Sequence, residues 1–164
     1  MSLYSAVEQK FNRPDLGLLV LRVVFGVLIF AAGLNKLMAG SPMFEQIGGA
    51  MAMFGITWQP KLWGLLSALT ETFGGLAILL GIFFRPALLL LIFNMIVACA
   101  VIPKFMGPLD FSSMGAFSKS LGNLEPPYIF CAAFIALLFT GQGKYAIHKS
   151  GGGGRSSGAK SAKD

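Results

Sequence analysis

Four long apolar segments, separated by more polar stretches, dominate the pattern of the chain. They cover residues 17–38, 62–84, 86–103 and 126–141. A helix that crosses the hydrocarbon core of a bilayer needs about 20 predominantly apolar residues, and the first three segments come close to or reach that length. The fourth would be only about 24 Å long as a helix, so it would extend further or thin the lipid locally. The pattern predicts four transmembrane helices.

The connections between these segments differ in length. Arg85 and Pro86 predict a tight turn, which would make the second and third spans antiparallel neighbours. In the longer first outer loop, apolar residues recur at helical spacing and predict a short amphipathic helix at the membrane interface. These residues are Met43, Phe44, Ile47, Met51 and Phe54. Such a helix is either a cap on the membrane surface or an entrance for a lipid or quinone.

Composition supports an integral membrane protein. Of 164 residues, 55% are hydrophobic and only 12% charged, with a mean hydropathy of +0.71, whereas soluble domains carry roughly 25% charged residues. Residues 1–149 fit one all-α, four-helix membrane bundle, and residues 150–164 form a flexible tail of Gly, Ser and Lys. No cleaved signal peptide is expected, so the first helix should be retained.

Basic residues in the short flanks predict the orientation. Lys10, Arg13, Arg85, Lys144 and Lys149 all fall on one side of the predicted bundle, and such residues favour the cytoplasmic side. Both termini are therefore predicted to be cytoplasmic. This distribution also accounts for the net charge of +6, so nucleic-acid binding is not needed to explain it.

Charged and amide side chains within the apolar segments predict a polar centre in the membrane. Glu71 lies deep in the second segment and needs a partner there. Counted from the ends of the apolar segments, the depth of Arg22 along the helix axis would differ from that of Glu71 by roughly 9 Å. The depth of Lys36 would differ by roughly 12 Å in the other direction. We therefore expect Arg22 to pair with Glu71, Lys36 to reach the outer surface, and Asn94 to face the bundle near the depth of Glu71.

The role of this pair has two interpretations. It either fixes the register of two helices without chemistry, or Glu71 takes up a proton or binds a polar headgroup while Arg22 tunes it. Small residues on the facing stripes predict close contact of the first two spans. These are Gly26, Gly33, Gly64, Gly74 and Gly75.

Redox and metal chemistry have few candidates. Cys99 and Cys131 are expected at similar depth on the third and fourth spans, where they are either a disulfide pair or inert buried thiols. His148 has no second ligand at metal spacing, so no metal site is predicted. No phosphate loop, CxxC motif or pair of haem-ligating histidines occurs, and catalysis by this chain alone is not expected.

The polar and glycine positions together resemble the DoxX family of small four-helix membrane proteins. They are Arg22, Gly26, Gly33, Lys36, Glu71-x-x-Gly74-Gly75, Leu79-Leu80-Gly81, Arg85 and the closing Gly141-Gln142-Gly143-Lys144-Tyr145. The chain departs from the family pattern at His148, where an aspartate is usual, and lacks the histidine often found after the third span. A role for that histidine is therefore not transferred.

The resemblance implies a multi-pass protein of the bacterial cytoplasmic membrane, associated with quinone- or thiol-linked oxidoreductases. Two functions are expected. The chain is an accessory subunit of a membrane redox complex, with a redox partner protein or a second copy of itself, and quinone as the implied cofactor. Alternatively, it is a stand-alone carrier or assembly factor for a small hydrophobic or lipid-like molecule, which would use the same polar centre.

Overall fold

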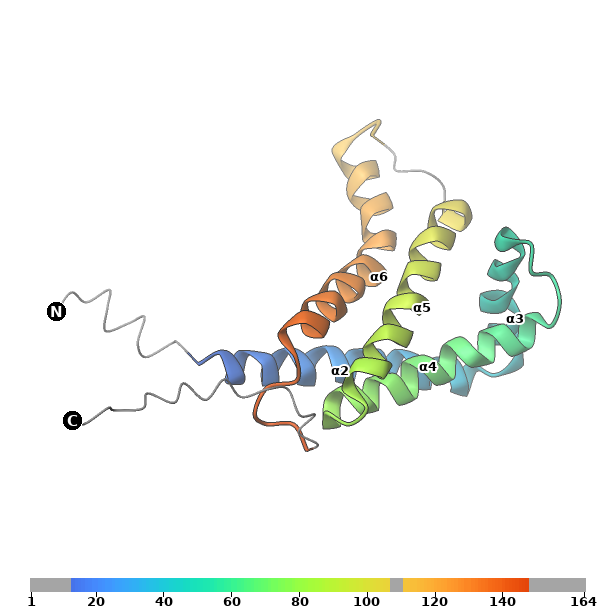
Figure 1. Ribbon diagram of the computed structural model, residues 1–164. Coiled ribbons are helices and arrows are strands. Elements are labelled where there is room, and N and C mark those ends of the chain that lie inside the picture. The colour runs from blue at the N-terminus through green and yellow to red at the C-terminus, as the bar shows by residue number, and fades with distance from the viewer. Residues whose placement is uncertain (1–12, 107–110, 148–164) are drawn as a thin grey trace, which may run out of the picture.

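The computed structural model describes residues 13–106 and 111–147, which are helical with no strand within this part of the chain (Figure 1). The helices are α2 (Pro14–Ala39), α3 (Ser41–Gly49), η1 (Ala50–Phe54), α4 (Pro60–Leu80), α5 (Phe84–Met106) and α6 (Met114–Thr140). The predicted tail, His148, Lys149 and Lys10 lie outside the described residues. The all-α prediction is confirmed for the described part.

Local chemistry sets the ends of α2 and α4. Each begins with a proline at its first positions, Pro14 and Pro60, where the missing N–H would have had no partner in the helix. α4 ends at Leu80 and is followed by Gly81, whose φ of 70° is in the left-handed region, the region that glycine adopts most readily. The amides of Gly81 and Ile82 both donate to the carbonyl of Ala77, at 2.8 and 3.0 Å. This closes the last turn of α4.

The expected end of the second span at residue 84 and the turn at Arg85-Pro86 are wrong. The chain leaves α4 after Leu80, turns through Gly81, Ile82 and Phe83, and enters α5 at Phe84. Gly81 causes the difference, because it ends α4 at Leu80, four residues earlier than the apolar run suggests. Pro86 then lies in the first turn of α5, where proline is tolerated.

The last helix begins earlier than the fourth apolar segment. α6 starts at Met114, where the Ser113 hydroxyl caps it by accepting a hydrogen bond of 3.1 Å from the Ala116 amide. It contains both prolines at 126 and 127 and ends at Thr140. Its apolar part, Pro126–Thr140, is shorter than a full span.

The four long helices form two antiparallel pairs. α2 and α4 lie side by side, and α5 and α6 form a hairpin that crosses them steeply (Figure 1). Their junction holds the hydrophobic core. Its buried side chains are Ile29, Ile78, Phe84, Leu88, Leu91, Met95, Phe134 and Leu137. α3 packs against the beginning of α4 on the same side as α5.

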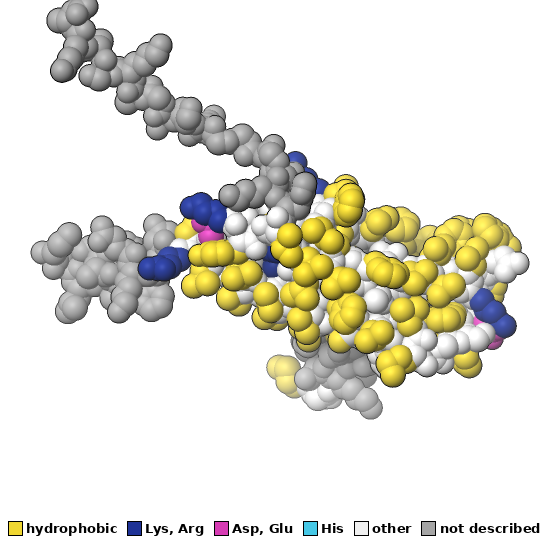
Figure 2. Space-filling model, turned by 90° about the horizontal axis from the view of Figure 1, so that it is seen from below, with side chains coloured by type: hydrophobic (Ala, Val, Ile, Leu, Met, Phe, Trp, Pro, Cys, Tyr) yellow, Lys and Arg dark blue, Asp and Glu magenta, His cyan; other side chains and the backbone are white. Residues whose placement is uncertain are grey.

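The surface has the distribution expected in a bilayer. Figure 2 shows apolar side chains over the middle of one face, with charged side chains mainly at its two ends. Exposed ion pairs occur near the start of α4, between Lys61 and Glu45, and near the start of α2, between Lys144 and Asp15. Within the described residues, α2, α4 and the Phe84–Val101 part of α5 are long and apolar enough to cross a membrane. A fourth crossing and cytoplasmic termini stay predictions.

Candidate functional site

The polar centre is built around Glu71 of α4, which is 2% exposed. Its two carboxylate oxygens each lie 2.6 Å from Nζ of Lys36, on α2. Such a charge-assisted pair is strong where water is excluded. The expected outward reach of Lys36 is therefore wrong, because its ammonium turns toward Glu71 instead.

The amide of Asn94 joins this pair from α5. Its Nδ2 donates to Glu71 Oε1 at 2.9 Å, and its Oδ1 accepts from the hydroxyl of Ser67 at 2.9 Å. Ser67 thereby fixes which end of the amide faces Glu71. Ser67 is not among the residues that the sequence predicts for the polar centre. We call Lys36, Ser67, Glu71 and Asn94 the polar cluster; it joins α2, α4 and α5 and carries no net formal charge.

The expected ion pair between Arg22 and Glu71 is wrong. Arg22 is 1% exposed, yet its guanidinium meets three backbone carbonyls instead of a carboxylate. It donates to Ile78 and Leu79 at 3.1 Å each, and to Gln142 at 2.9 Å. Carbonyls at the end of a helix have no partner within it and carry partial negative charge, so they hold a buried cation well. Arg22 therefore caps the end of α4.

Arg22 also ties down the segment that follows α6. The carbonyl of Gln142 is one of its partners, while Lys144 binds Asp15 through its amide and its ammonium, at 3.2 and 3.1 Å. The amide of Ile147 donates to the carbonyl of Leu80 at 3.2 Å. This segment consequently covers the junction of α2 and α4. The feature of the sequence that could have indicated the role of Arg22 is Gly81, because a glycine of this kind marks a helix end, where backbone carbonyls lack partners within the helix.

We expect Arg22→Lys to loosen this junction. A lysine has the charge but not the planar fork that reaches three carbonyls, and each lost hydrogen bond contributes about 0.5–1.5 kcal/mol. A net loss of roughly 1–3 kcal/mol should follow. Hydrogen exchange of the Ile147 amide and thermal unfolding in detergent measure it. The exposed Arg85→Lys is the control, and equal protection in both variants would contradict the capping role.

The five glycines expected at helix contacts serve three different interfaces. At Gly26, Gly33 and Gly75, an added Cβ would lie within 3.2 Å of backbone atoms across the α2–α4 contact. Gly64 instead meets the backbone of Phe44 on α3, and Gly74 faces Leu91 on α5 at 2.9 Å from the built Cβ. α3 is therefore pressed against α4, and its position at a membrane interface stays a prediction.

A cavity of about 700 Å³ opens beside the polar cluster, between α3, α4 and α5. Its walls are largely apolar and include Met43, Ile47, Met51 and Val97. All four members of the polar cluster line it. Pockets of roughly 300–1,000 Å³ with apolar walls and a few convergent polar groups are typical sites for small molecules.

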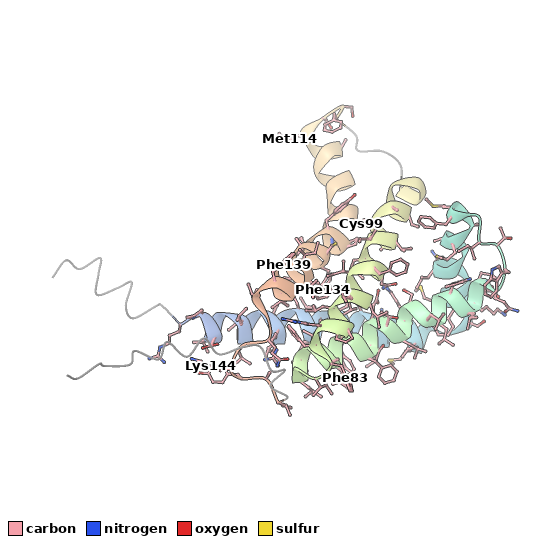
Figure 3. All side chains as sticks on the ribbon, in the orientation of Figure 1. Phe83, Cys99, Met114, Phe134, Phe139 and Lys144 are labelled. Atoms are coloured by element: carbon pink, nitrogen blue, oxygen red, sulfur yellow. The ribbon has the colours of Figure 1, made fainter. Side chains whose placement is uncertain are left out.

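The two cysteines lie on neighbouring helices, and neither of them lines the cavity. Cys99 is on the half of α5 distant from α2 and α4 (Figure 3), and Cys131 is on α6. Both thiols are half-buried and free, so the expected alternative of a disulfide is not formed in this structure. In the described ranges no three His, Cys, Asp or Glu side chains gather as metal ligands would.

Comparison with known proteins bears on the region that contains this site. Neither a curated protein nor a solved structure matches the chain significantly. The DoxX family model matches residues 17–104, more than half of the chain. The match spans α2 to α5 and includes every member of the polar cluster. The chain therefore belongs to the DoxX family, as a membrane protein of that family.

Proposed function

We propose that this DoxX protein binds a small amphipathic molecule in the cavity between α3, α4 and α5. The observation that carries the proposal is the combination of an apolar cavity of about 700 Å³ with a buried polar cluster in its wall. Apolar walls take up the body of such a molecule, and the cluster orients its polar part. No chemical step by the chain itself is needed.

The rim of the cavity suggests where the ligand comes from. Leu90 and Phe93 line the cavity and are 59% and 65% exposed. In a membrane protein these side chains face acyl chains, so the rim is continuous with the lipid-facing surface. A ligand dissolved in the bilayer could enter without passing through water.

The cavity is compatible with both functions expected from the sequence. A quinone has an apolar body and carbonyl oxygens that can accept hydrogen bonds from donors such as Lys36 and Asn94. Association with a membrane redox complex is a prediction that rests on the family resemblance. Residence in the bacterial cytoplasmic membrane rests on the same resemblance. A neutral lipid or other metabolite would fit the same chemistry, as a carrier requires.

Filling the cavity tests the proposal. Ala98 of α5 lines the cavity, whereas Ala100 is exposed on the same helix and does not. We expect Ala98→Trp to reduce the small molecules that co-purify in mild detergent by at least about tenfold, because overfilling costs roughly 1–3 kcal/mol or more. Solvent extraction and mass spectrometry provide the measurement.

The matched control is Ala100→Trp, which adds the same bulk on the lipid-facing side of α5. It should retain the same small molecules as the unmodified protein. Identical retention by the Ala98 variant would rule out this cavity as the binding site. A redox protein that co-purifies with the unmodified protein and with both tryptophan variants would favour the accessory subunit over the carrier.

A further inference from the structure

Resting on the proposed function, we propose that the ligand is an uncharged molecule whose oxygen accepts a hydrogen bond from Nε1 of Trp63. Trp63 is then the residue that selects the ligand.

The indole nitrogen of Trp63 is buried, and it has no hydrogen-bond partner among the described residues. An indole N–H can only donate, and a buried donor without an acceptor costs about 1–3 kcal/mol. Trp63 lines the cavity, so an acceptor atom on a bound molecule would remove this cost. Carbonyl, ether and hydroxyl oxygens are suitable acceptors.

The electrostatics of the cavity favour a neutral ligand. Within the described part of the chain, Lys36 and Glu71 are the charged residues that line it, and each already neutralises the other at 2.6 Å. A carboxylate or ammonium ligand would enter without a free counter-charge, and burying an unpaired charge is costly. A hydroxyl or carbonyl oxygen does not carry this penalty.

The spacing along α4 gives the ligand an approximate extent. Trp63, Ser67 and Glu71 are four residues apart in turn, so they lie on one face of the helix. The rise from Trp63 to Glu71 is about 12 Å. The ammonium of Lys36 has three N–H donors and two oxygen partners on Glu71. A ligand that reaches both ends would therefore find one donor at Trp63 and another at Lys36.

The neighbouring tryptophan helps to hold the donor in place. Trp58 packs edge-on against Trp63, with ring centroids 5.4 Å apart and planes at 67°. Trp58 is 59% exposed and does not line the cavity. It is therefore a suitable control, because its indole lies beside Trp63 but does not line the cavity.

The test uses three probes of equal chain length: a long-chain methyl ketone, the n-alkane and the fatty acid. The chain has two tryptophans, so a ¹⁵N–¹H spectrum of the indole groups in detergent has one signal for each. We expect the ketone to move the Trp63 proton signal downfield, as hydrogen bonding does, and to leave the Trp58 signal in place. The ketone should bind about tenfold more tightly than the alkane or the ionised acid.

Replacing the indole isolates the N–H. Trp63→Phe keeps an aromatic ring but removes the donor, so it should lower the affinity for the ketone to about that for the alkane. Trp58→Phe should leave ketone affinity unchanged. Equal binding of ketone and alkane in the unmodified protein, or ketone affinity unaffected by Trp63→Phe, would overturn this inference.

The proposed function has a separate readout in the same assay. If all probes bind and Ala98→Trp blocks them, the cavity binds ligands whatever Trp63 contributes. If Ala98→Trp changes no affinity, the cavity is not the binding site and the proposed function itself fails. Tighter binding of the fatty acid than of the ketone would contradict the preference for uncharged ligands, but it would not contradict the proposed function of the cavity.

Discussion

Lys36→Met should destabilise the protein by roughly 3–5 kcal/mol, because it leaves the carboxylate of Glu71 buried without its cation. Glu71 is 2% exposed, and both of its oxygens depend on the Lys36 ammonium at 2.6 Å. The remaining partner, the amide of Asn94, is a neutral donor. Thermal or denaturant unfolding in detergent, followed by circular dichroism, measures the loss.

A second substitution separates lost charge pairing from lost packing. Adding Glu71→Gln to Lys36→Met removes the unpaired charge while it keeps an oxygen for the Asn94 amide. The double variant should therefore recover much of the stability, as replaced buried pairs often do. A double variant that is less stable than Lys36→Met would mean that the pair is not the source of the effect.

Gly48→Ala should have the second largest effect, because it forces α3 away from α4. A Cβ at Gly48 would overlap the backbone of Pro60, where a flexible side chain cannot move aside. Overpacking typically costs about 1–3 kcal/mol, and rigid backbone contacts belong at the upper end. Since α3 forms a wall of the cavity, the melting temperature and the retention of small molecules should both fall.

The adjacent glycine provides the control for this prediction. A Cβ at Gly49 would meet nothing within 4 Å, and alanine is favoured over glycine in a helix by about 1 kcal/mol. Gly49→Ala should therefore keep or slightly raise stability. If both variants unfold alike, the close approach of α3 and α4 is not what holds the cavity wall.

The buried acid could be found from the sequence, but its cation could not. A carboxylate in an apolar run stands out, and the expected position of Asn94 close to Glu71 also rested on depth along the helices. Choosing between Arg22 and Lys36 required the register of α2 against α4, which was estimated from the ends of apolar runs. These ends do not coincide with the ends of the helices.

Glycine contacts set the actual register. Gly26 lies against Gly75 and Leu79, and Gly33 lies against Thr72. In this register Lys36 is about 3–6 Å from the level of Glu71 along the helix axis, and Arg22 is about 15–18 Å away. A lysine side chain covers the shorter offset. The Arg22 side chain is too short to span the longer offset to Glu71. It therefore binds the carbonyls at the end of α4 instead.

The cavity was harder to anticipate than the helices. Apolar periodicity predicted a helix after residue 40, but it did not indicate which surface that helix would cover. The deciding contacts are those of Gly48 with Pro60 and of Gly64 with Phe44. They involve backbone atoms far apart in sequence, which hydropathy does not report. For the same reason, Trp63 and Ser67 were not expected as cavity residues.

The most direct test of the polar cluster is a solid-state NMR distance measurement in lipid bilayers. With ¹⁵N in the Lys36 ammonium and the Arg22 guanidinium, and ¹³C in the Glu71 carboxylate, dipolar recoupling reports which cation is adjacent. We predict a strong coupling of Glu71 to Lys36 Nζ and none to Arg22. A coupling of Glu71 to the Arg22 guanidinium, with none to Lys36, would contradict the account.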